Sequence, residues 1–224
     1  MKLGLKMVGT AVAGLVFFGV LLFLPAATFN YWQAWLFIAV FAVSTWIPSI
    51  YLLRTNPAAL QRRMRAGPAA ETRTLQKIVI AVAFLSMAAM IVLSALDHRF
   101  GWSRVPVAVS LFGDVLVAIG LGIAMFVVIQ NGYAAANVAV EKGQRLVSKG
   151  LYGFVRHPMY VGNLVLMVGI PVALGSYWGL LFVIPGVVVL VVRILDEEQV
   201  LEQQLTGYRE YTQSVHYRLV PYVW

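Results

Sequence analysis

The sequence contains no cysteine and few charged residues. Without cysteine the chain cannot form disulfides, bind a metal through thiolates or use a cysteine nucleophile. Only 12% of the 224 residues are charged, and nine of them are acidic, whereas about a quarter of the residues of a soluble domain are charged. So few charged side chains cannot cover a water-facing surface. The composition therefore predicts a protein whose natural solvent is the lipid bilayer.

Long uncharged runs contain most of the hydrophobic residues, which make up 61% of the chain. The run between Lys6 and Arg54 is too long for one membrane span of about 20 residues, and 25–33 divides it with a proline, an asparagine and interfacial aromatic residues. A second run, from Pro158 to Val192, is divided by 169–179, which contains Pro171 and Gly175. These patterns predict helices near 7–25, 31–53, 77–96, 106–130, 158–174 and 177–197.

This pattern predicts an all-α integral membrane protein. We expect about six transmembrane helices, of which the last two form a short helical hairpin, and then an amphipathic C-terminal tail. No small-residue cleavage site follows the first apolar run, so this run is interpreted as a retained helix. We expect one membrane domain, 1–224.

The 17 cationic residues predict the orientation of the six helices. If both termini lie on one side, fifteen cations fall on that side and only Arg99 and Arg104 on the other. The positive-inside rule then predicts a multi-pass protein with both termini and the long polar segments in the cytoplasm. Contact with anionic headgroups thus explains the net charge of +8, and we expect no nucleic acid partner.

One candidate site is Arg156-His157-Pro158-Met159-Tyr160, at the start of the fifth helix. Proline suits the first turn of a helix, and arginine and tyrosine are ordinary interface anchors, so an anchoring role alone remains open. However, histidine is an uncommon anchor, and nearby glycines permit close approach to a ligand. The N–H groups of the helix start would also suit an anion.

The second candidate site is the acidic segment at the end of the last helix. Arg193 and Glu197 are four residues apart and so share a helix face. Three consecutive acids, Asp196, Glu197 and Glu198, repel one another in a protein that has few acids. They are either solvated where the helix leaves the membrane, or they neutralise a cation and orient an arginine.

The remaining polar residues give weaker indications of function. The tail 207–224 either lies on the headgroups or folds over a cofactor as a lid. Asp114 is expected to have a structural role near the outer end of its helix, where it can reach water or Arg104. Asp97 and His98 are too few for a metal site, so no metal is expected.

The C-terminal part of the chain resembles a known family. The strings GLYGFVRHPMYVGNLVLMVGIPVALGS (150–176) and RILDEEQVLEQQLTGYREYTQSVHYRLVPYVW (193–224) are similar to the isoprenylcysteine carboxyl methyltransferase family of integral membrane enzymes, to which phospholipid N-methyltransferases are related. The resemblance is specific over about 130–224. It implies four transmembrane helices in 1–130, a catalytic methyltransferase core in 131–224, and S-adenosyl-L-methionine as the methyl donor.

The resemblance also implies site residues. Arg193 matches an arginine that orients the acceptor carboxylate, and either Glu197 or Glu198 is the associated acid. The implied cofactor-binding residues are Gln144, Leu146, Val147, Gly150, Tyr152, Arg156, His157, Tyr160 and Glu197.

The methyl acceptor remains open at this point. The first hypothesis is carboxyl O-methylation of an isoprenylcysteine-like lipidic acceptor that enters from the bilayer. The alternatives are phospholipid N-methylation and S-methylation of a small thiol. An NADPH-dependent sterol-type membrane reductase, which has a somewhat similar C-terminal end, and a non-enzymatic membrane scaffold or transporter are further possibilities.

Overall fold

The structure is a computed structural model that describes residues 2–64, 71, 73–134, 140 and 143–224. Within these residues every regular element is helical, which confirms the all-α prediction. The α-helices are α1 (Lys2–Ala26), α2 (Trp32–Thr55), α3 (Pro57–Met64), α4 (Thr74–Phe100), α5 (Val107–Gln130), α6 (Pro158–Ala173), α7 (Val183–Gln204) and α8 (Tyr208–Ser214), and the 3₁₀ helices are η2 (Gly150–Gly153) and η3 (Trp178–Phe182).

Five helical segments of the described chain are long and apolar enough to cross a bilayer: α1, α2, α4, α5 and the continuous stretch from η3 through α7. The sixth, α6, has 16 residues and a length of about 24 Å, which is shorter than the bilayer core of about 30 Å. The six predicted segments are therefore all present, and the chain is a multi-pass membrane protein.

Among the differences from the sequence prediction, two helices end later than expected and one helix is additional. Helix α4 continues to Phe100, where Gly101 adopts a left-handed conformation with φ of 65° and ends it. The last helix starts as a 3₁₀ turn and continues to Gln204, because Asp196, Glu197 and Glu198 all have partners. Helix α3 was not predicted, although Asn56 caps it by accepting the N–H of Ala59 and proline occupies its first position.

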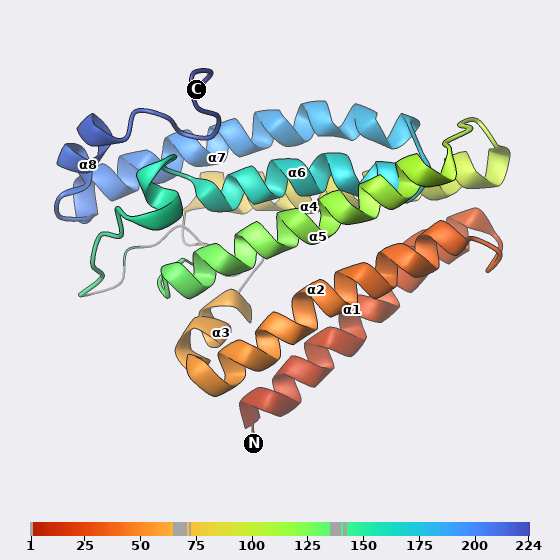
Figure 1. The fold of residues 1–224 in the computed structure, drawn as a ribbon, viewed down its shortest axis with the longest axis horizontal. Coiled ribbons are helices and arrows are strands. Elements are labelled where there is room, and N and C mark those ends of the chain that lie inside the picture. The colour runs from red at the N-terminus through yellow and green to blue at the C-terminus, as the bar shows by residue number, and fades with distance from the viewer. Residues whose placement is uncertain (1, 65–70, 72, 135–139, 141–142) are drawn as a thin grey trace.

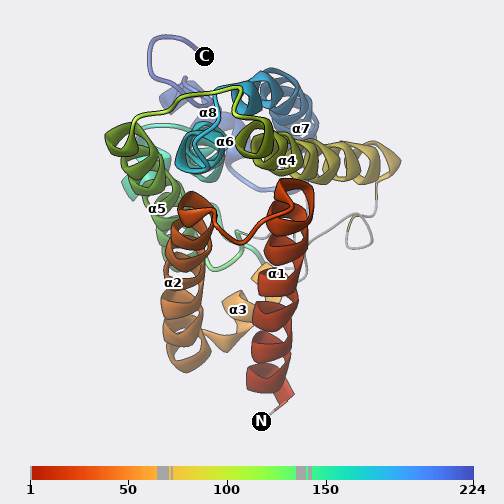
Figure 2. The ribbon, with the colours of Figure 1, turned by 90° about the vertical axis from the view of Figure 1, so that its right-hand side faces the viewer.

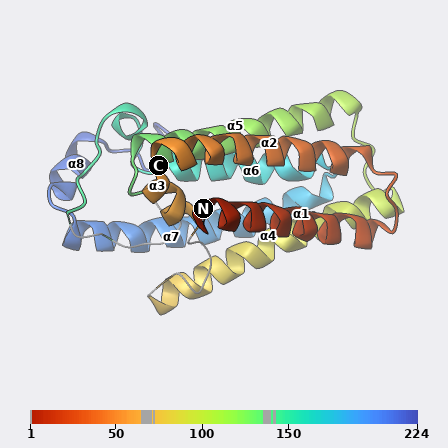
Figure 3. The same ribbon diagram turned by 90° about the horizontal axis from the view of Figure 1, so that it is seen from below.

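The helices run lengthwise, and the connections gather at two ends (Figure 1). One end, which we name the pocket end, carries α3, η2 and α8, whereas the short connections α1–α2, α4–α5 and α6–η3 lie at the opposite end, the loop end. Figure 2 shows α1 and α2 extending from one side of the group formed by α4, α5, α6 and α7, and Figure 3 shows α8 beside the end of α7. The long polar segments thus share one end.

Glycines allow α5 and α6 to pack closely. A Cβ atom added to Gly120 would lie 2.7 Å from the carbonyl oxygen of Gly162, and one added to Gly162 would lie 2.7 Å from that of Gly120. Small residues at such positions let helix backbones approach within a membrane. Gly120 therefore has a packing role, whereas an added Cβ at Gly122 meets no atom within 4 Å. The close pair of helices holds the start of α6 in place.

Polar contacts fix the loop end. Asp97 accepts hydrogen bonds from the hydroxyls of Ser103 and Ser176, each over 2.6 Å. The ring of His98 stacks on Tyr31 at a centroid distance of 3.8 Å. Asp97 and His98 therefore join connections to one another, and no group of three possible metal ligands occurs among the described residues.

Asp114 differs from its expected environment. It is 5% exposed, and neither carboxylate oxygen has a hydrogen-bond partner among the described residues. The suggested contact with Arg104 is therefore wrong, because the exposed Arg104 forms no ion pair with the buried carboxylate.

Candidate active site

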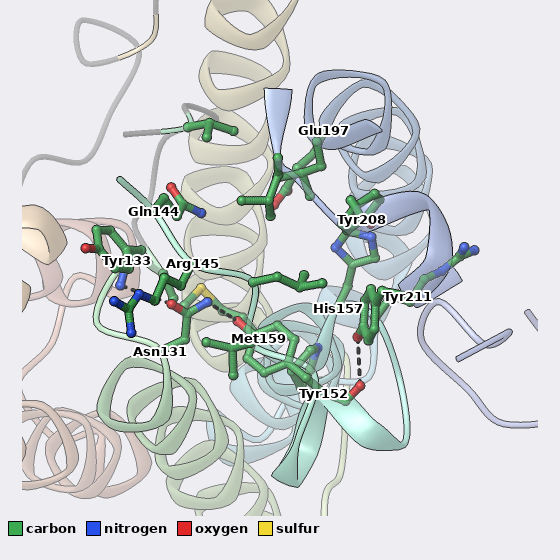
Figure 4. A pocket seen from close by; sticks show the side chains of 18 of the residues that line it. Asn131, Tyr133, Gln144, Arg145, Tyr152, His157, Met159, Glu197, Tyr208 and Tyr211 are labelled. Atoms are coloured by element: carbon green, nitrogen blue, oxygen red, sulfur yellow. Dashed lines mark hydrogen bonds between the residues drawn. The ribbon is translucent and has the colours of Figure 1, made fainter. Parts of the chain in front are cut away.

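A pocket with a cavity volume of about 100 Å³ lies at the pocket end. Its walls come from the α5–α6 connection, the start of α6, the end of α7 and α8. Figure 4 shows Asn131, Tyr133, Gln144 and Arg145 on one side, and His157, Tyr208 and Tyr211 on the other. We name it the polar pocket.

The polar pocket brings together most of the residues singled out in the sequence. Those that line it are Gln144, Leu146, Val147, Tyr152, Arg156, His157, Tyr160 and Glu197. Gly150 is not among the lining residues; its φ is +64°, and the side chain of Gln130 occupies the space that a Cβ would need. Gln130 also accepts the N–H of Leu151. Gly150 thus shapes the η2 turn behind the wall.

The start of α6 is held by the C-terminal tail. Pro158 is the first residue of the helix, as predicted. The N–H groups of Arg156 and His157 donate to the carbonyls of Tyr217 and Arg218 over 2.9 and 3.0 Å. The tail therefore accepts the two N–H groups that immediately precede α6.

Glu198 joins three basic side chains. Its Oε1 atom lies 3.1 Å from Nε of Arg156 and 3.2 Å from Nε2 of His157, and its Oε2 atom accepts Nε–H of Arg218 over 2.8 Å. These residues come from the α6 entry, α7 and the tail. Glu198 is buried and does not line the polar pocket, so it holds three segments together from behind the pocket wall.

Glu197 faces the polar pocket and contacts Tyr160. The Tyr160 hydroxyl donates to Glu197 Oε2 over 2.5 Å and accepts Nε–H of Arg193 over 2.9 Å. Arg193 and Glu197 share a helix face, as their spacing indicates, and the Tyr160 hydroxyl lies between them. The three side chains form one hydrogen-bonded row.

Arg193 pairs with an acid far away in the sequence. Its Nη2 atom lies 3.1 Å from Glu71 Oε1, and its Nη1 atom donates to Gln76 Oε1 over 2.8 Å. Gln76 is 0% exposed and donates in turn to Asp196 over 2.5 Å. With Tyr160 on Nε, every nitrogen of the guanidinium group has a partner.

Tyrosines form much of the remaining wall of the polar pocket. The Tyr211 hydroxyl donates to the carbonyl of Tyr152 over 2.7 Å, and Asn131 donates to the Tyr152 hydroxyl over 3.2 Å. Burial raises the pKa of Tyr152 to about 12, so the phenol stays neutral at physiological pH. The Tyr208 hydroxyl is buried without a hydrogen-bond partner among the described residues, which leaves a polar atom for a ligand.

Sequence reasoning missed several residues of this region. Asn131, Tyr133 and Arg145 line the polar pocket, but a polar group after an apolar helix has no feature that separates a ligand contact from an ordinary helix end. Glu71 and Gln76 were missed because they meet Arg193 across more than a hundred residues of sequence.

A second, larger cavity lies among α4, α5, α6 and α7, with a volume of about 440 Å³. Most of its lining is aliphatic or aromatic, and we name it the apolar cavity. Its polar lining residues are few: Arg63, Ser86, Tyr160, Asn163 and Arg193.

The two cavities share wall residues. Ala134, Met159 and Tyr160 line both of them. A ligand in the polar pocket and an apolar ligand between the helices would therefore approach each other at Met159 and Tyr160. The arrangement can hold a polar reactant and a lipid-like reactant on either side of these two side chains.

Comparison with known proteins gives a family match over part of the chain. Residues 109–206 match the phospholipid methyltransferase family. This confirms the resemblance predicted from the sequence, because the family includes the integral membrane methyltransferases of the isoprenylcysteine type. The match covers α5, α6 and α7 and thus the helices that carry His157, Tyr160 and Glu197, and it indicates a membrane methyltransferase.

A second similarity is shorter. The chain is 34% identical over 90 residues to Delta(14)-sterol reductase TM7SF2 of Mus musculus. The aligned part is 39% of this chain and spans only 22% of the reductase.

Proposed function

We propose that this protein transfers a methyl group from S-adenosyl-L-methionine to an amphipathic acceptor that enters from the bilayer. The observation that carries the proposal is that Met159 and Tyr160 line both cavities. A water-soluble donor and a lipidic acceptor need separate sites whose reacting ends meet. Such an arrangement lowers the entropic part of the barrier by fixing both reactants.

The side chains of the polar pocket fit the chemical groups of S-adenosyl-L-methionine. Glu197 is the one acid among the described residues that line the pocket, and its Oε1 atom remains available for a cation. Arg145 suits the carboxylate of the donor, and Asn131, Gln144 and the unpartnered Tyr208 hydroxyl offer hydrogen bonds. The aromatic rings can pack on the adenine. When bound, the cofactor supplies a methyl group activated by a sulfonium sulfur.

The residues of this chain then position and enclose the reactants. Glu197 is held by Tyr160, which is held in turn by Arg193. Glu198 and the tail fix the entry of α6, so that His157 and Tyr160 keep their places in the wall. The apolar cavity removes water from the acceptor, which makes an anionic nucleophile more reactive.

For the acceptor we propose carboxyl O-methylation of an isoprenylcysteine-like molecule. A carboxylate is ionised at neutral pH and needs no base, whereas the ammonium group of phosphatidylethanolamine must first lose a proton. The wide apolar cavity suits a prenyl chain. Phospholipid N-methylation and S-methylation of a small thiol are the alternatives.

In this proposal Arg193 is a positioning residue. All three nitrogens of its guanidinium group already have partners, one of them Glu71, so an acceptor carboxylate would have to displace this acid. Arg193 therefore aligns Tyr160 and, through it, Glu197.

The similarity to a sterol reductase motivates a second candidate function, in which the polar pocket binds NADPH. The aligned segment is a small part of that enzyme, and the matched methyltransferase family covers more of this chain. The polar pocket also contains an acid suited to a sulfonium cation.

The deciding experiment is calorimetry on purified protein with S-adenosylhomocysteine and, separately, with NADPH. We expect saturable binding of S-adenosylhomocysteine and none of NADPH; the reverse result would contradict the proposal. Labelled methyl transfer to a prenylcysteine analogue, phosphatidylethanolamine and a small alkyl thiol then identifies the acceptor. Methylation of the phospholipid or the thiol alone would contradict the proposed acceptor but not the reaction class.

A further inference from the structure

Arg63 lines the apolar cavity from α3 and has no acidic partner in the described chain. Its Nη1 atom donates to the hydroxyl of Ser49 over 3.1 Å, and no carboxylate of the described residues lies within ion-pair distance. The side chain is partly buried, and this burial lowers the pKa of the guanidinium group. Arginine nevertheless stays charged at neutral pH, so the cavity wall carries a cation that has no counter-ion among the described residues.

The contrast with Arg193 in the same cavity is informative. Arg193 has an acid, an amide and a hydroxyl as partners, whereas Arg63 has one neutral hydroxyl. A charge that is removed from water without a counter-ion is unfavourable. A ligand that brings an anion to Arg63 would remove this cost, while an anion at Arg193 would have to replace Glu71.

Arg63 also lies near the junction of the two cavities. Leu60, one turn earlier on α3, belongs to a buried cluster with Met125 and Val128, against which Met159 packs. Met159 lines both the polar pocket and the apolar cavity. An anion at Arg63 would therefore lie at the end of the apolar cavity that meets the polar pocket.

We propose that Arg63 binds the anionic headgroup of an amphiphile whose apolar chain occupies the apolar cavity. The charge of Arg63 and the aliphatic lining of the cavity together favour a molecule with one acid group and a long chain, such as a fatty acid or an acidic prenyl compound. The identification of this amphiphile as the methyl acceptor rests on the proposed function. Arg63 then selects acidic over neutral acceptors.

The test measures binding of two probes with the same chain length, one with an anionic and one with a neutral head group. Equilibrium dialysis of the full chain in a neutral detergent gives affinities for labelled laurate and dodecanol. We expect Arg63→Ala to weaken laurate binding by about tenfold to a hundredfold, as for a lost charge-assisted hydrogen bond, with less than about a threefold change for dodecanol. Arg63→Glu should reverse the preference, so that dodecylamine binds better than laurate.

Arg54→Ala is the matched control, because Arg54 is an exposed cation in the last turn of α2 and its loss should leave both affinities unchanged. Thermal denaturation verifies that each variant is folded, and Arg63→Lys, which keeps the charge, should retain a preference for laurate if Arg63→Ala does not fold. Equal laurate affinities of the wild type and Arg63→Ala would overturn the proposal. So would an equal loss of laurate binding in Arg54→Ala, because Arg63 would then act only as one of several cations that attract anionic headgroups.

The outcome is separable from that of the proposed function. S-adenosylhomocysteine binding to Arg63→Ala should equal that of the wild type, because Arg63 does not line the polar pocket. If neither protein binds S-adenosylhomocysteine, the proposed function fails, while the laurate measurement still decides the role of Arg63.

Discussion

The Tyr160 hydroxyl donates a hydrogen bond to Glu197 Oε2 over 2.5 Å. Tyr160 lines both cavities, and Glu197 lines the polar pocket. The bond therefore connects the wall shared by the cavities to the acid that is proposed to face the cofactor. Arg193 donates to the same hydroxyl from the other side, which fixes its orientation.

Tyr160→Phe removes this hydroxyl and keeps the ring. We expect kcat for methyl transfer to fall about tenfold or more, because Glu197 and Arg193 both lose a charge-assisted hydrogen bond. The acceptor KM should change little, since the apolar surface of the ring remains. Tyr177→Phe, at the exposed loop end, is the control. A wild-type kcat in Tyr160→Phe would rule out the proposed role.

Glu198→Gln tests the acid behind the pocket wall. Three basic partners lose a buried counter-ion, and breaking such a pair costs about 3–5 kcal/mol. We therefore expect a clear drop in the melting temperature followed by circular dichroism. If the melting temperature stays at the wild-type value, the ion pairs of Glu198 do not hold the tail.

Glu197→Gln tests the acid that faces the pocket. Its amide can still accept the Tyr160 hydroxyl, so stability should change little. The affinity for S-adenosylhomocysteine, which has no sulfonium charge, should fall less than that for S-adenosylmethionine. For the latter we expect about a tenfold loss, in line with a lost charged contact. Equal losses of affinity for the two compounds in calorimetry would show that Glu197 does not interact with the sulfonium cation.

Gly120→Ala tests the α5–α6 contact. The added methyl group would overlap the backbone of Gly162, and such overpacking costs about 1–3 kcal/mol. Gly122→Ala is matched in helix and chemistry but faces open space, so its stability should equal or exceed that of the wild type. Thermal denaturation of the two variants side by side checks this, and equal melting temperatures would contradict the packing role of Gly120.

Glu71→Gln distinguishes the two arginines of the apolar cavity. Arg193 loses its buried counter-ion, so we expect a lower melting temperature. Laurate affinity should stay within about twofold, because the anion is proposed to bind Arg63. If laurate instead binds about tenfold or more tightly in dialysis, this would indicate that the anion binds Arg193.

Much of the fold could be predicted because the bilayer constrains it. The six apolar segments are all helical, since a chain within lipid must satisfy its backbone hydrogen bonds internally. Their boundaries were less predictable: α4 ends only at Gly101, and α7 continues through three acids. The partners that stabilise those acids come from α4, α6 and the segments before them, and from the C-terminal tail.

The candidate site could be predicted in composition but not in arrangement. The segment around His157 and Tyr160 does meet Glu197 of α7 at one pocket. Which of Glu197 and Glu198 faces the pocket was not predictable from the sequence. Successive residues of a helix point about 100° apart, and the side that faces the pocket depends on how α7 is rotated against α6.

The sequence by itself determined a multi-pass helical membrane protein, with its polar chemistry gathered at one end and a family pattern in its C-terminal half. These features depend on local composition and spacing, which a single chain displays directly. Only the tertiary structure decided that Glu71 is the partner of Arg193, that Arg63 lines the apolar cavity, and that the two cavities meet at Met159 and Tyr160. The reason is physical: these contacts join helices that are distant in sequence, and their geometry depends on helix packing, which no local pattern encodes.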